Sequence, residues 1–262
     1  DITLDLKSDA FTVRFMEDTN TNLCKDMTQA NSEMEADNQT SSVLIPAGLF
    51  LKGGIFAAAD CEATNIFHLT KEATGGAIPG KGPFRLEHED GGTLTPGNAV
   101  DSFSKIYTAG TASCAASPVD VFVFRARRYF VGQDQNGSPG LYRQVFDANP
   151  NNANLFEEFA ERLIDGVENM QILYGEDTSG NRVANVYANA TAVTNWEDVV
   201  SVKLALLFAT VDEDFTAPLD TTNNYQLLNA APFDPTPVAD DHRRRKIVEA
   251  TVSLRNRQLS IN

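Results

Sequence analysis

The stretch that decides the fold covers residues 163–175 and reads Leu163-Ile164-Asp165-Gly166-Val167-Glu168-Asn169-Met170-Gln171-Ile172-Leu173-Tyr174-Gly175. Apolar residues just upstream of Gly166 recur at helical spacing, which predicts a helix over residues 154–165. Gly166 ends this helix, and the apolar pattern then predicts a strand over residues 167–174. The alternation slips at Asn169-Met170, which predicts a β-bulge at that point.

Short strands separated by turn-rich loops are predicted on both sides of this stretch, because β-branched and aromatic runs alternate with Gly, Asn, Asp and Thr clusters. The expected strands cover residues 10–15, 54–59, 65–70, 119–131, 182–187, 199–210 and 246–254. Asp134-x-Asn136-Gly137 predicts a hairpin turn. Long polar loops are expected over residues 17–42 and 72–97. The predicted fold class is α+β, mainly antiparallel sheet with one clear helix, in a single globular domain over residues 1–262.

The composition excludes several classes of partner. The 262 residues include 21 Lys and Arg against 36 Asp and Glu, which gives a formal net charge of -15. Nucleic acid and anionic membrane surfaces are therefore poor partners. The longest mainly apolar stretch, residues 199–211, is shorter than the roughly 20 residues that a spanning helix needs. We therefore expect no membrane-spanning segment within this sequence.

The three cysteines, Cys24, Cys61 and Cys114, lack the spacing of a zinc site. Two of them can form one disulfide, which suits an exported protein, and three free thiols in a cytosolic protein are the alternative. All three pairings are open on sequence grounds. The pairing that we expect joins Cys24 to Cys61, because it closes the shortest loop, and it leaves Cys114 free.

Catalytic motifs for dinucleotide, phosphate, acyl-transfer and metalloprotease chemistry do not occur in the sequence. We expect no catalytic residue, no cofactor and no metal. His88-Glu89-Asp90 offers an imidazole beside two carboxylates, but its glycine-rich context favours a solvated turn over a metal site. Asp177-x-Ser179-x-Asn181 resembles part of a calcium loop, but its glycine and its twelfth position do not fit that pattern.

The one basic run in this acidic chain consists of Arg243, Arg244, Arg245 and Lys246. One interpretation is the start of a strand whose charges pair with neighbouring acids. The other is a docking patch for an acidic partner.

Several motifs occur together in a fixed order. Residues 163–175 are followed by an Asp/Gly-rich turn, by residues 193–203, and by the ending Thr251-Val252-Ser253-Leu254-Arg255-Asn256-Arg257. Upstream motifs lie at residues 8–15, 59–67, 129–131 and 139–143. This order closely resembles the PilW family of type IV pilus minor pilins. The motif residues to which the resemblance gives structural roles are Gly166, Val167, Tyr174, Gly175, Trp196, Leu254, Arg255, Asn256 and Arg257.

The resemblance implies a pilin-like globular head whose long N-terminal pilin helix is missing from this chain. It implies a minor pilin that takes part in assembly priming and the tip complex, supporting twitching motility, adhesion and DNA uptake. The implied partners are other minor pilins and a tip adhesin, with no direct contact to nucleic acid and membrane contact only through the missing helix. We expect docking through strand edges and through an apolar strip that this helix leaves exposed.

The location implied is the bacterial inner membrane and periplasm before assembly, and the extracellular pilus afterwards. A close alternative is the J-type pseudopilin of type II secretion, which has a similar priming role. An alternative of another class is an exported hydrolase that uses His88, Glu89 and Asp90.

Overall fold

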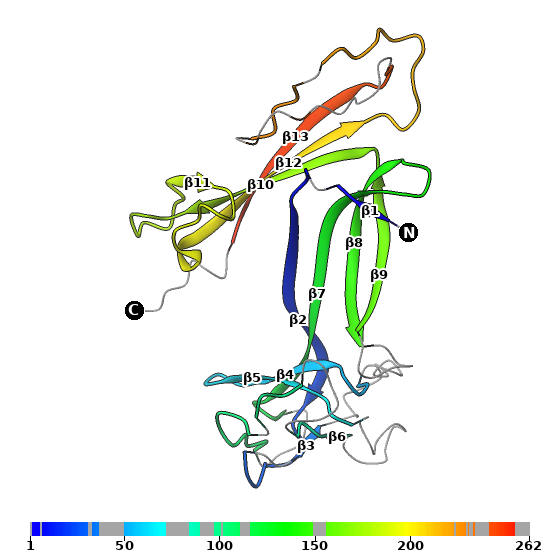
Figure 1. Cartoon of the computed structure of the whole chain (residues 1–262). Coiled ribbons are helices and arrows are strands. Elements are labelled where there is room, and N and C mark those ends of the chain that lie inside the picture. The colour runs from blue at the N-terminus through cyan, green and yellow to red at the C-terminus, as the bar shows by residue number, and fades with distance from the viewer. Residues whose placement is uncertain are drawn as a thin grey trace. The chain divides into compact units, whose positions relative to one another are not determined.

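The computed structural model describes residues 2–5, 7–30, 33–36, 50–71, 84–89, 97–100, 102–110, 116–148, 156–222, 224–228, 230, 233 and 241–254. Over these residues the chain is mainly antiparallel β-sheet (Figure 1). This part of the predicted fold class is confirmed. None of the helices in these ranges has the length and apolar character needed to cross a membrane.

The strands follow one another along most of the chain. They are β1 (Thr3–Leu4), β2 (Ala10–Asn22), β3 (Met34–Ala36), β4 (Ile55–Ala59), β5 (Thr64–His68), β6 (Phe84–Leu86), β7 (Asp120–Gln133), β8 (Pro139–Ala148), β9 (Phe156–Asp165), β10 (Val167–Glu176), β11 (Val186–Ala188), β12 (Val199–Ala209) and β13 (Arg245–Ser253). A short 3-10 helix, η2 (Trp196–Asp198), precedes β12.

The predicted helix over residues 154–165 is wrong. Phe156–Asp165 form strand β9, while residues 154 and 155 lie outside the described ranges. Strand β9 pairs with β8, and Arg162 of β9 donates hydrogen bonds to the main-chain oxygens of Ser138 (3.0 Å) and Pro139 (2.7 Å). Helix propensity in a short segment is worth little without a packed partner, so this tertiary pairing overrides it.

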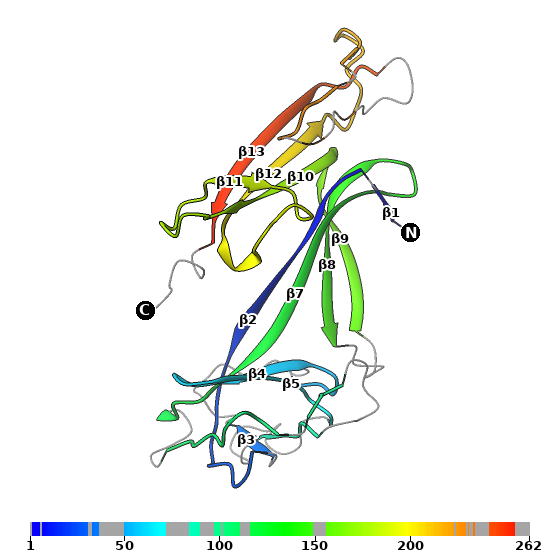
Figure 2. The same cartoon turned by 60° about the vertical axis from the view of Figure 1, so that its left-hand side comes forward.

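The strands form three sheets. One seven-stranded sheet has the order β5-β4-β7-β8-β9, with β1 and β2 also paired to β7. A four-stranded sheet has the order β11-β10-β12-β13, which is clearest in Figure 2. Strands β3 and β6 form a two-stranded sheet. The predicted hairpin turn at residues 134–137 joins the neighbouring strands β7 and β8, and the Gly137 amide donates to the Asp134 carbonyl oxygen.

The predicted polar loops are shorter than expected. Strand β2 continues to Asn22 and β3 covers residues 34–36, so the loop over residues 17–42 is interrupted twice. Strand β6 lies within residues 72–97. The other parts of these loops fall largely outside the described residues.

The chain divides into two compact units. The first comprises residues 1–11, 128–143 and 160–262, and the second comprises residues 12–127 and 144–159. The dividing points fall within strands β2, β7, β8 and β9. A single domain over residues 1–262 therefore stays a prediction.

Each unit has its own core. In the second unit, the rings of Phe56, Phe67, Phe103 and Tyr107 contact one another in series, with centroid distances of 6.1, 5.3 and 5.9 Å. In the first unit, one cluster centres on Val131, Met170 and Ile172. A smaller one contains Ala205, Leu207 and Leu227.

The cysteines do not form the expected pair. Cys61 is a free, exposed thiol, so the predicted Cys24–Cys61 disulfide is wrong. Cys24 is disulfide-bonded. Cys114 lies outside the described residues. The length of the closed loop alone therefore does not predict which cysteines are bonded.

Gly166 joins β9 to β10 in the left-handed region, with φ of 73°. A Cβ atom at this position would overlap the carbonyl oxygen of Ala209, which belongs to the neighbouring strand β12. The Gly166 oxygen in turn accepts a hydrogen bond from the Ala209 amide at 2.7 Å. The glycine therefore permits both the turn and the close approach of β12.

We predict that Gly166→Ala lowers the free energy of unfolding by about 3 kcal/mol, because it adds overpacking to an unfavourable backbone conformation. Gly137→Ala is the matched control. Gly137 has φ of 76°, but the space around its Cβ position is open, so we expect a loss of only about 1 kcal/mol. Urea unfolding of both variants measures the difference, and equal losses would contradict the role given to Ala209.

Candidate assembly interface

Three rows of apolar side chains cross the four-stranded sheet on one face. The rows, each given in the order β10, β12, β13, are Tyr174, Val202 and Val252; Ile172, Leu204 and Ala250; and Met170, Leu206 and Val248. The register between β10 and β12 shifts between Val167 and Asn169, which confirms the predicted bulge. Because of this shift, Val167 and Met170 both join the same core cluster.

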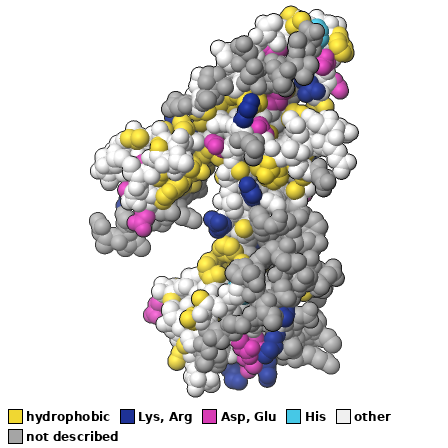
Figure 3. Space-filling view, in the orientation of Figure 1, with side chains coloured by type: hydrophobic (Ala, Val, Ile, Leu, Met, Phe, Trp, Pro, Cys, Tyr) yellow, Lys and Arg dark blue, Asp and Glu magenta, His cyan; other side chains and the backbone are white. Residues whose placement is uncertain are grey.

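This apolar face is buried at β10 and exposed at β13. Met170 and Ile172 pack in the cluster that includes Val131, Phe11 and Leu141. On β13, Val248 is 46% exposed and Val252 is 55% exposed. Hydrophobic side chains accordingly form a band over this part of the surface in Figure 3. An exposed continuation of a core face is a common feature of protein contact sites.

Strand β13 is also an edge of its sheet. It follows β12 at the end of the strand order, and no strand among the described residues pairs with its other side. Such an edge presents unpaired amides and carbonyl oxygens, which can accept a strand from a neighbour. The edge and the exposed valines lie on the same strand.

Trp196 lies beside one end of this face. Its ring meets the ring of Tyr174 edge-on, with centroids 4.8 Å apart. The tryptophan is about half-exposed, so it covers Tyr174 rather than closing the core. The Glu176 carboxylate holds this loop in place by accepting hydrogen bonds from the Thr194 hydroxyl and from the amides of Thr194 and Asn195. These hydrogen bonds lower the pKa of Glu176.

Of the remaining motif residues, Gly175 and Leu254 lie within the described ranges and make defined contacts. Gly175 lacks a side chain where Ser201 and Ala184 approach closely, and the register shifts again at this point. The Leu254 amide donates to the Val200 oxygen at 2.8 Å. Arg255, Asn256 and Arg257 lie outside the described residues.

The Asp177 turn is held by its own backbone. The Asp177 carboxylate accepts hydrogen bonds from the amides of Ser179 (3.0 Å), Gly180 (2.8 Å) and Arg182 (2.5 Å). Both carboxylate oxygens therefore face the loop that they close. This arrangement explains the aspartate without a calcium ion.

Arg245 of the basic run is buried among three carboxylates. Its guanidinium pairs with Glu168 (2.7 Å), with Asp220 (2.9 Å) and with Asp241, and its side chain is only 1% exposed. Burial opposes the ionisation of Asp220, but hydrogen bonds from Tyr225, Thr222 and Arg245 lower its pKa to about 2. Arg245 thus joins the start of β13 to β10 and to the residues that follow β12.

The rest of the basic run is divided between pairing and exposure. Arg244 forms an ion pair with Asp214 at 2.8 Å, and Lys246 is exposed. Arg244 and Arg245 therefore follow the interpretation in which the charges pair with neighbouring acids. A docking role for Arg243 and Lys246 stays a prediction.

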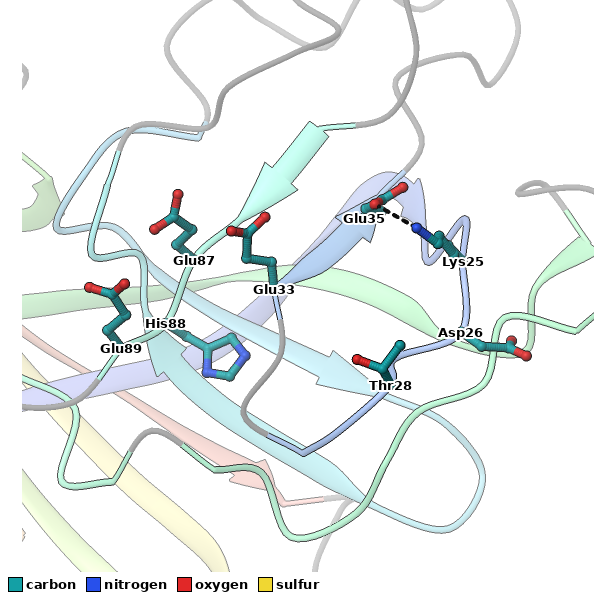
Figure 4. A pocket seen from close by; sticks show the side chains of 8 residues that line it. All are labelled: Lys25, Asp26, Thr28, Glu33, Glu35, Glu87, His88 and Glu89. Carbon is teal, nitrogen blue, oxygen red and sulfur yellow. Dashed lines mark hydrogen bonds and ion pairs between the residues drawn. The ribbon is translucent and has the colours of Figure 1, made fainter.

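A pocket of about 440 Å³ in the second unit is lined by Lys25, Asp26, Thr28, Glu33, Glu35, Glu87, His88 and Glu89 (Figure 4). Its acids already have partners. They are Lys25 for Glu35, Arg85 for Glu33, Lys71 for Glu87 and Glu89, and the Ala109 amide for Asp26. No cluster of three or more metal-ligating side chains occurs in the described ranges.

Of the three residues of the hydrolase alternative, the two that the structure describes, His88 and Glu89, are not brought together. The His88 ring is buried and stacks on Phe103 with a centroid distance of 4.0 Å. Glu89 is exposed and points in another direction (Figure 4), as neighbouring side chains of an extended segment do. Asp90 lies outside the described residues. His68, in β5, is also buried, and burial lowers its pKa.

Sequence reasoning missed the partners of Arg245. Glu168 lies 77 residues away along the chain and Asp220 lies 25 residues away. No spacing rule connects residues at such separations. The sequence did contain one signal, a single basic run in an acidic chain. This signal predicted that the arginines pair with acids, but it did not identify which acids.

Comparison with known proteins identifies one family. A family model described as Type IV Pilus-assembly protein W matches residues 128–256. No significant match was found among curated proteins or among solved structures. The match begins at the point in β7 where the first unit resumes, and it includes β13.

We predict that Arg245→Ala lowers the free energy of unfolding by about 3–5 kcal/mol, because it leaves three carboxylates without their buried cation. Arg244→Ala is the matched control. The Arg244 side chain is 67% exposed, so we expect a loss below about 1 kcal/mol. Denaturant unfolding at neutral pH measures both values. Similar losses in the two variants would contradict the assignment of Arg245 as the central ion pair.

Proposed function

Because this chain belongs to the PilW family of type IV pilus-assembly proteins, we propose that it is a minor pilin that primes pilus assembly and sits in the tip complex. In this role it supports twitching motility, adhesion and DNA uptake through assembly and not through catalysis. It is held in the cell envelope before assembly and on the surface pilus afterwards. Its partners are other minor pilins and a tip adhesin.

The observation that carries this proposal is the position of the candidate interface within the family match. Residues 128–256 include β10, β12 and β13, and therefore the exposed valines and the open edge. An assembly protein needs a surface that exposes apolar area without destabilising its own fold. Strand β13 meets this requirement because β12 holds one side of it over nine residue pairs.

The proposed partner segment is an apolar strand of a companion minor pilin. It pairs with the free edge of β13 and places its side chains against Val248 and Val252. Main-chain hydrogen bonds then supply affinity, while the apolar side chains supply specificity. The net charge of -15 favours companions that present basic faces and discourages self-association.

We predict that the double variant Val248→Lys and Val252→Lys binds the soluble heads of companion minor pilins about tenfold more weakly or worse, because it places charge where apolar contact is needed. Thr251→Lys is the control, since it adds charge to the same exposed strand on the opposite face. Calorimetry measures the affinities, and circular dichroism verifies the fold. Unchanged binding by the double variant would contradict docking on this face.

Deletion of the gene tests the function itself. We expect deletion to remove most surface pili and twitching, and the intact gene supplied in trans to restore both. Undiminished piliation would contradict the assembly role. Assignment to the pilus takes precedence over the J-type pseudopilin because the matching family is one of pilus assembly.

The cysteines bear on the envelope location. Cys24 is disulfide-bonded and Cys61 is free, and the sequence contains one further cysteine, Cys114. The bridge that we propose therefore joins Cys24 to Cys114. A disulfide of this kind belongs in an oxidising compartment, which supports export.

We predict that peptide mapping of unreduced protein from the cell envelope finds Cys24 linked to Cys114 and finds Cys61 open to alkylation. Cys114→Ser should then lower the free energy of unfolding by roughly 4 kcal/mol, as expected for a long closed loop. Cys61→Ser is the control and should change stability little. Three alkylatable thiols in the exported protein would contradict the bridge.

A further inference from the structure

Residues 210–220, called here the acidic loop, follow β12 and are fixed at both ends. At the first end, the Thr210 amide donates to the main-chain carbonyl oxygen of Arg244 at 3.1 Å. The Arg244 amide donates to the Thr210 hydroxyl oxygen at 3.2 Å. At the other end, the Asp220 amide donates to the Asp241 oxygen at 2.8 Å. Arg245 also pairs with the Asp220 carboxylate.

The middle of the acidic loop is fixed as well. The Asp214 carboxylate accepts from the Arg244 guanidinium at 2.8 Å and from the Thr216 amide at 3.1 Å. The Ala217 amide donates to the main-chain carbonyl oxygen of Asp214 at 2.7 Å. The main-chain carbonyl oxygen of Ala217 in turn accepts a hydrogen bond from Nδ1 of His242 at 2.8 Å. These bonds brace the middle of the loop as well as its two ends.

This well-braced loop exposes apolar side chains. Phe215 is 76% exposed, the largest exposed fraction of any large apolar side chain in the described residues, and Val211 and Leu219 are also exposed. The Phe215 ring lies beside the His242 ring, with centroids 5.4 Å apart. At the upper end of Figure 3, hydrophobic, acidic and histidine side chains lie together on the surface. Apolar exposure on a rigid support is the arrangement of a contact residue.

The acidic loop contains two acids that pair with arginines and two that do not among the described residues. Asp214 and Asp220 form ion pairs with Arg244 and Arg245. Asp212 and Glu213 are exposed, and the ion pairs found among the described residues do not include them. Asp212 and Glu213, which lie close to Phe215 in the sequence, are therefore available to a basic partner, whereas Asp214 already pairs with Arg244.

We propose that the acidic loop is a preformed protein anchor, in which Phe215 enters an apolar pocket on a companion pilus-assembly protein while lysine or arginine side chains at the rim of that pocket pair with Asp212 and Glu213. The choice of a pilus-assembly partner rests on the proposed function. The braced loop loses little conformational freedom on binding, and aromatic side chains commonly dominate such contacts. The exposed carboxylates accelerate association with a basic face. A second copy of the chain is a poor partner because both copies carry a charge of -15.

The first test is crosslinking of the full-length protein in its own bacterium. Photoreactive benzoylphenylalanine replaces Phe215 in one strain and Val183, which is 61% exposed, in a control strain. We expect one discrete product that forms at position 215 and not at position 183, and that mass spectrometry assigns to another pilus-assembly protein. No product at position 215, or the same products at both positions, would overturn the anchor.

The second test measures affinity between the purified chain and the crosslinked protein. We expect Phe215→Ser to weaken binding about thirtyfold, while Phe215→Leu, which keeps apolar volume, retains most of it. Asp212→Asn with Glu213→Gln should slow association severalfold at low salt and flatten its salt dependence. Binding by Phe215→Ser within twofold of the parent, in protein with an unchanged melting temperature, would overturn the proposal.

The failures of the two proposals are distinguishable. If gene deletion removes pili but Phe215→Ser leaves pili and binding intact, the anchor is wrong and the assembly role stands. If position 215 captures, with the expected charge dependence, a protein outside the pilus machinery, the choice of partner is wrong. Undiminished piliation after gene deletion would then overturn the assembly role as well.

Discussion

The buried ion pairs of the Arg245 guanidinium are the interaction on which the rest of the first unit depends. Its contacts with Glu168, Asp220 and Asp241 connect β10, the acidic loop and the start of β13 through one buried cation. Buried ion pairs of this kind add less net stability than their number suggests, because each charge has lost its water. Their main effect here is positional. The edge strand begins, and the acidic loop ends, at residues that this cluster holds.

Most strands could be predicted from the sequence, because alternation of apolar and polar residues reports directly on which face is buried. The bulge near Asn169 was predictable for the same reason, since it appears as a break in that alternation. Strand β9 was not predictable. Its Glu, Ala and Leu residues have the spacing and propensity of a helix, and the pairing with β8 that overrides them is visible only in three dimensions.

The candidate interface was only partly predictable. Docking through strand edges and an apolar strip follows from the family resemblance and stays a prediction. Among the described residues, β13 carries both an unpaired edge and exposed valines. The basic run appeared to be a surface feature, but Arg245 is buried because three acids surround it, two of which, Glu168 and Asp220, are distant in the sequence. The acidic loop had no signal in the sequence, because its rigidity arises from hydrogen bonds to residues 241–244. Cysteine pairing failed for a related reason, since proximity along the chain says little about proximity in the fold.

The register of β13 also has a mechanical consequence. Strands β12 and β13 are antiparallel and in register over nine residue pairs, from Ser201 with Ser253 to Ala209 with Arg245. A pull directed along β13 loads all the hydrogen bonds of this ladder at once, whereas a pull across the strands breaks them one after another. A strand that carries tension along its own axis therefore resists much greater force than one that is peeled from the edge. The direction of load through this unit then decides whether its sheet yields or holds.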